Sequence, residues 1–112
     1  MTFEQVNTII NSIATALKCD YSYSAFKDRK ERDRFLVFYY SGTDDLYADG
    51  TNYSNIEGLT IEFYSSRKEI ENEQTIQSML NSSGLVFDKV ETWINDELLY
   101  LSRYTTEVLI NG

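Results

Sequence analysis

FLVFYYSGTDDLYADGTNYSNIEGLTIEFY, residues 35–64, is the stretch that decides the fold. Residues 35–40 are apolar or aromatic at every position, which is typical of a central strand covered on both faces, or of a strand whose outer face meets a partner. Residues 59–64 alternate between apolar and polar side chains, which indicates a strand with one wet face. Together they predict a long hairpin, joined by the polar loop of residues 41–58.

The segments just before this hairpin are a short extended run and a charged run. Residues 19–26 are rich in tyrosine and serine and predict a short edge strand. Residues 27–34, KDRKERDR, carry five positive and three negative groups, a net charge of +2. This composition predicts a solvated turn between two strands.

Further toward the N-terminus, residues 2–17 predict a helix. Thr2 and Gln5 have the spacing of a capping box, in which two side chains satisfy free backbone N–H groups of the first turn. Apolar residues then recur on one helical face, and this stripe is expected to be core: Val6, Ile9, Ile10, Ile13, Ala14 and Leu17.

On the C-terminal side, the pattern becomes helical from Ser65. Ser66 is the expected cap, Ile70, Ile76, Met79 and Leu80 form a thin apolar face, and residues 81–84 end the helix. Two β-rich runs, residues 85–94 and 98–108, follow with Trp93 just before their connection. The prediction is therefore an α+β fold of order α-β-β-β-α-β-β, with helices on one side of a mainly antiparallel sheet.

Length and charge limit the possible functions. The 112 residues suffice for one domain, expected to span residues 1–112. The net charge of −8 disfavours binding to nucleic acid and to anionic membranes. The chain has no long apolar run and a single cysteine, so it is expected to be soluble and cytoplasmic when made.

Residues that could carry chemistry are few, because histidine is absent. Asp44, Asp45 and Asp49 resemble a calcium loop, but Tyr47 stands where a ligand oxygen is needed and no glutamate closes the loop. Glu69 and Glu73 are expected to lie one helical turn apart on a wet face, with a solubilising role. Cys19 has no histidine to activate it and is expected to be a small buried hydrophobe. We therefore expect no metal, no cofactor and no enzymatic activity.

The loop of residues 41–55 is instead predicted to be an assembly surface. Tyr47 and Tyr53 are its expected anchors, because tyrosine buries a large area and keeps a polar tip. The loop also carries the acidic residues Asp44, Asp45 and Asp49. A neighbouring subunit can meet these with basic residues of the charged run: Arg29, Lys30 and Arg32.

Three motifs carry a resemblance to a known family. These are the aromatic strand ending in Tyr39-Tyr40, the loop with Ala48-Asp49 and Tyr53, and the strand Leu59-Thr-Ile-Glu-Phe-Tyr. With them the chain resembles small tail-terminator or tail-completion proteins of tailed phages and prophages of Gram-positive bacteria. Family members often have a proline where this chain has Arg34, so the resemblance does not extend to the backbone at that position.

The resemblance implies a structural subunit without catalytic residues. Such proteins form a homo-oligomeric ring, with a hexamer as one candidate size, that caps the tail tube and contacts head–tail connector proteins. The expected location is the cytoplasm during assembly and the tail or neck of the finished virion. Two alternatives stay open, namely a head–tail connector (neck) protein and a non-phage acidic protein-binding module.

Overall fold

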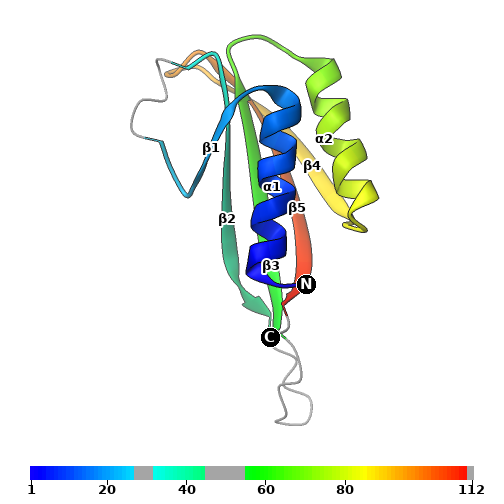
Figure 1. Cartoon of the computed structure of the whole chain (residues 1–112). Coiled ribbons are helices and arrows are strands. Elements are labelled where there is room, and N and C mark those ends of the chain that lie inside the picture. Colours follow the sequence, from blue (N-terminus) through cyan, green and yellow to red (C-terminus); the bar gives the residue numbers. More distant parts are fainter. Residues whose placement is uncertain (27–31, 45–54, 111–112) are drawn as a thin grey trace.

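The computed structural model describes residues 1–26, 32–44 and 55–110. Two helices lie on one face of a five-stranded sheet, as Figure 1 shows. The elements follow in the order α1 (Phe3–Leu17), β1 (Asp20–Tyr23), β2 (Arg34–Asp44), β3 (Asn55–Ser65), α2 (Ile70–Ser82), β4 (Phe87–Ile94) and β5 (Leu99–Ile110). The predicted α+β class and element order are confirmed. Neither helix combines the length and apolar character that a membrane crossing requires.

The sheet has the strand order β1-β2-β3-β5-β4 and is antiparallel at every pairing except one. The exception is β1 with β2, which run parallel from the pair Asp20 and Phe35 to the pair Tyr23 and Phe38. A tight turn joins antiparallel strands, whereas parallel neighbours require the chain to return to its starting end. The charged run joins these two parallel strands, and most of the predicted solvated turn, residues 27–31, lies outside the described part.

The central hairpin is longer than predicted. Strand β2 continues to Asp44 and β3 begins at Asn55, so residues 41–44 and 55–58 are strand and not loop. The pairing shifts between Tyr40 and Gly42, leaving Ser41 without a partner in β3, as in a β-bulge. Apart from Ile56, the residues of these extensions are small or polar and give no alternating pattern, so the sequence does not show that the strands continue.

Helix α1 has the predicted capping box. The Gln5 amide donates to Thr2 Oγ1 at 3.1 Å, and the Thr2 amide donates to Gln5 Oε1 at 2.8 Å. Five members of the predicted stripe are buried and Ile9 is partly buried against them. The helix ends at Lys18, whose left-handed backbone (φ 56°) lets its N–H bond to carbonyl groups of the last turn.

Helix α2 begins later than predicted. Its N-cap is Glu69, with no side-chain cap, and Ser66 lies outside the helix. The reason is that β3 continues through Ser65, whose hydroxyl donates to the Arg67 carbonyl at 2.6 Å. Ile76 and Leu80 are buried as expected, but Ile70 is 59% exposed and does not belong to the apolar face. The predicted end is confirmed, with Gly84 at φ 77°.

Strand β2 is covered on both faces, one of the two options that its sequence left open. Leu36 and Phe38 pack under the helices, whereas Phe35 and Val37 pack on the other face. The second face is covered by the twisted β4–β5 hairpin, which contributes Leu99 and Leu101. Figure 1 shows this hairpin crossing behind β3, so that its tip lies near the start of β2.

Candidate functional site

The predicted assembly residues fall mostly outside the described chain. Asp45, Tyr47, Asp49 and Tyr53 lie within residues 45–54, and Arg29 and Lys30 lie within residues 27–31. Asp44 is the last residue of β2, opposite Ile56, and so is not a loop residue.

Arg32 is placed against its own domain. Its guanidinium forms an ion pair with Asp20 of β1 and lies 4.4 Å from the centre of the Phe26 ring. The ion pair ties the residues just before β2 to β1, and the ring contact ties them to the segment that follows β1. The predicted role of Arg32 in meeting a neighbouring subunit stays a prediction, and such a role would have to coexist with these contacts.

A buried carboxylate lies on the sheet face opposite the helices. Glu62 of β3 has a side chain that is 7% exposed. Arg103 Nε donates to Glu62 Oε2 at 2.9 Å, and the Tyr64 hydroxyl donates to Glu62 Oε1 at 2.8 Å. The Tyr39 hydroxyl adds a longer contact of 3.3 Å. We call Tyr39, Glu62, Tyr64 and Arg103 the Glu62 cluster.

The Glu62 cluster corrects the predicted wet face of β3. Thr60, Glu62 and Tyr64 alternate as expected, but all three are buried. A period-two pattern shows which side chains share a face, but it does not show whether neighbouring strands cover that face. The partner Arg103 pairs with Glu62 across two strands whose sequence positions are 41 residues apart, and no local signal joins them.

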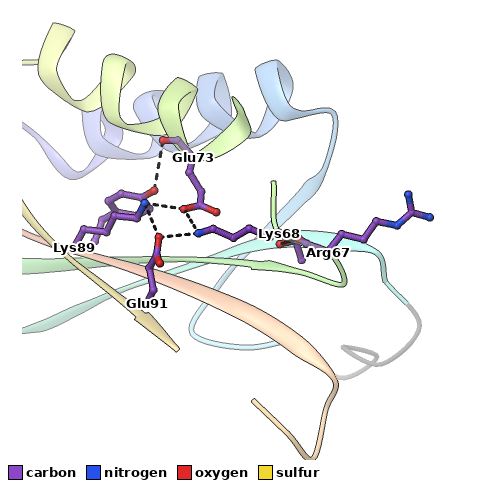
Figure 2. Close-up of polar contacts among 7 residues, drawn as sticks. Arg67, Lys68, Glu73, Lys89 and Glu91 are labelled. Atoms are coloured by element: carbon purple, nitrogen blue, oxygen red, sulfur yellow. Dashed lines mark hydrogen bonds and ion pairs between the residues drawn. The ribbon is translucent and has the colours of Figure 1, made fainter. Parts of the chain in front are cut away.

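A second buried carboxylate lies under α2. Figure 2 shows Glu73 reaching from the helix toward two lysines of the chain beneath it, while Arg67 points away. The Glu73 side chain is 4% exposed and accepts from the ammonium groups of Lys68 and Lys89 at 2.7 Å each. Glu91 of β4 contacts the same two ammonium groups at 2.7 and 3.0 Å. We call Lys68, Glu73, Lys89 and Glu91 the four-charge network.

Contacts within the four-charge network shift the pKa values of Glu91 and Lys89. Hydrogen bonds from Lys68 and Lys89 lower the pKa of Glu91 to about 2. For Lys89, burial acts to lower the pKa, but hydrogen bonds to Glu73 and Glu91 outweigh it and raise the pKa. The predicted wet face for Glu69 and Glu73 is therefore wrong: Glu73 is buried, and Glu69 accepts two hydrogen bonds from Arg34 at 2.9 and 3.1 Å.

The remaining features to consider for chemistry are the Cys19 thiol, clusters of possible metal ligands and one groove. Burial raises the pKa of the Cys19 thiol to about 11, a shift that nearby Arg34 only partly opposes, so the reactive thiolate is disfavoured near neutral pH. Within residues 1–26, 32–44 and 55–110, no three acidic or cysteine side chains gather closely enough to hold a metal ion. An open groove of about 560 Å³ lies between the start of β2 and the start of α2, and Arg34, Glu69 and Ile70 line it.

Comparison with known proteins finds similarity among solved structures but none by sequence. No family model matches the sequence, and no curated protein matches it. Among solved structures, the chain is similar to the sheath/tube terminator of an extracellular contractile injection system (PVC) in its extended state, with a TM-score of 0.43 and 8% identity. The alignment covers all of this chain and 58% of that terminator, so this chain spans little more than half of its length.

Proposed function

We propose that this protein is a structural subunit that completes the tail of a long-tailed phage or prophage, forming a ring where the tail tube joins the head. The element order carries this proposal. The resembled family has an N-terminal helix, an aromatic strand, a long loop, a second strand, an acidic helix and a final hairpin. These elements follow one another in the same order here, with β1 inserted before the aromatic strand.

The positions of the motif residues add support. The aromatic strand is β2, which is buried on both faces, and Glu62 and Tyr64 of the second strand belong to the Glu62 cluster. The two strand motifs of the resemblance therefore lie at the centre of the sheet, and the loop motif lies outside the described residues. Such residues constrain a fold strongly, because a buried carboxylate requires its partners.

We further propose that the protein is not an enzyme. Acid–base catalysis needs a carboxyl group poised to exchange a proton with a substrate. Here the buried carboxylates Glu62 and Glu73 are occupied by Arg103 and by two lysines, as in a structural ion pair. The remaining candidate, Cys19, has a raised pKa.

Electron microscopy of the purified protein with isolated components tests the proposal. Mixed with tail tubes that lack a terminator, the protein is expected to bind as a ring at one end of each tube. Binding to tailless heads and not to tubes would favour the neck-protein alternative. The tubes and heads should come from a phage that encodes this chain. Binding to neither would contradict both the terminator and the neck-protein assignments, and would leave the protein-binding module as the alternative.

A further inference from the structure

One open edge of the sheet is the far half of β2, because the outermost strand β1 is short. Strand β1 covers β2 only from Phe35 to Phe38, whereas β2 continues to Asp44. In the described chain, no strand lies beside the outer edge of residues 39–44, which we call the β2 overhang. The Tyr40 amide there makes a long hydrogen bond of 3.4 Å to the Tyr23 hydroxyl. Exposed backbone groups of this kind pair readily with another strand.

The second open edge is β4. It pairs with β5 over eight residues in unbroken register, and alternate backbone groups of such a strand point away from its partner. No other described strand lies beside it. Of the usual protections of an edge, β4 has no bulge and the chain has no proline, whereas Asp88 and Glu91 are exposed charges on this strand. Its lysine, Lys89, is held under α2 by Glu73, and Val90 is 56% exposed.

Both edges carry exposed aromatic side chains on the helix side of the sheet. Beside the β2 overhang, Phe3 and Tyr23 are half-exposed and their rings lie 5.0 and 6.0 Å from that of Tyr40. Beside β4, Trp93 and Tyr100 are partly exposed with ring centres 4.7 Å apart. Alternation along β4 and β5 places this pair on the same face as Lys89 and Tyr104. Joining the two edges in one sheet would bring the two aromatic groups to the same side.

We propose that the β2 overhang of one copy pairs with β4 of the next copy, so that the sheet continues from subunit to subunit. This inference rests on the proposed ring and names the surfaces that build it. Two different edges in contact make a head-to-tail interface, which can repeat and close into a ring. If β4 of one copy paired with β4 of another, both β4 edges would be used and the assembly would stop at a dimer. The aromatic side chains beside the β2 overhang would then stay uncovered. Because each copy has a net charge of −8, association should strengthen with salt.

Two variants block one edge each. Tyr23→Lys puts a charge beside the β2 overhang, where the Tyr23 hydroxyl accepts from the outward-facing Tyr40 N–H. Val90→Lys puts a charge on the β4 edge that pairing would have to desolvate. Ile70→Lys is the matched control, because Ile70 is exposed to the same extent but lies on a helix.

Sedimentation velocity on the folded proteins gives the readout. The wild type and Ile70→Lys are expected to form assemblies larger than a dimer, and each edge variant alone is expected to stay monomeric. Mixing the two edge variants should restore one junction and give a 1:1 dimer, because each supplies the edge that the other lacks. Assembly by either variant alone, no dimer in the mixture, or a monomeric wild type at high concentration and salt would overturn the proposal.

The outcome is separable from that of the proposed function. If edge variants still form rings on tail tubes, the edge pairing is wrong and the terminator function stands. If the edges pair as proposed but the wild type ignores tail tubes, the terminator function is wrong and the interface stands.

Discussion

Glu62 and Glu73 are buried on opposite sides of the same sheet, and each is held by cationic neighbours. The two sites differ in which hydrogen-bond donors remain for the carboxylate when one cationic partner is removed. Glu62 keeps two tyrosine hydroxyls if Arg103 is removed, whereas Glu73 depends on two lysines that also serve Glu91. Buried ion pairs of this kind cost stability mainly when one partner is removed.

For the Glu62 cluster we expect non-additive losses. Arg103→Met should lower the free energy of unfolding by about 1–3 kcal/mol, less than for a fully buried pair because Arg103 is 42% exposed and the tyrosines remain. Arg103→Met with Glu62→Met should recover much of this loss, because no buried charge is then left unpaired. Urea denaturation measures both, with Arg67→Met as the control. A double variant that loses the sum of the single effects would contradict the coupling.

For the four-charge network we expect an acid-dependent loss of stability. The pKa of Glu91 is about 2 in the folded protein and 4.5 when unperturbed. A lowered folded pKa contributes stability above pH 4.5, and this contribution is lost as the pH falls toward 2. Glu91→Gln should therefore flatten the fall of melting temperature over that window, whereas exposed Glu107→Gln should not. Parallel melting profiles for Glu91→Gln and wild type would refute this role.

At the scale of elements, α1 is the helix with the larger buried apolar face. Its stripe covers the helix-side core, and Ile13 at the centre of the stripe is fully buried. Helix α2 contributes less apolar surface and compensates with the four-charge network. The two helices therefore hold the same face of the sheet by different means.

Ile13→Asp is expected to unfold the protein or to cost several kcal/mol, because it buries an unpaired charge in a domain of ordinary marginal stability. Asn11→Asp adds the same charge on the exposed face of α1 and should melt near wild type. Circular dichroism during heating compares the two. Equal melting temperatures would show that the stripe does not form the core.

The sequence predicted correctly those elements whose pattern lies within a short stretch of the chain. The capping box and stripe of α1 and the alternation of residues 59–64 each depend on neighbours in the sequence, and all were located correctly. The parallel direction of β1, the burial of Glu62 and the pairing of Glu73 with Lys89 depend on segments brought together by folding. No periodicity contains that information, so these features appear only in the folded structure.

For the whole molecule, the expected assembly loop provides a test that does not depend on the sheet edges. Tyr47→Ala with Tyr53→Ala should leave the melting temperature of the subunit nearly unchanged, because both residues lie beyond the paired ends of β2 and β3. Tail capping should be lost if these tyrosines anchor the contact, since interface energy is concentrated in such side chains. Electron microscopy of tail tubes measures the capping. Normal capping by the double variant would remove the loop from the assembly surface.

The position of β5 has a consequence for synthesis on the ribosome. Strand β5 is last of the seven elements in sequence, yet it lies between β3 and β4 in the sheet. Until it emerges, β3 lacks its inner neighbour and β4 has no partner at all. Native pairing of these three strands must therefore wait until translation has passed residue 110. A chain interrupted before Leu99 would expose unpaired strands, which is the condition that favours aggregation and chaperone binding.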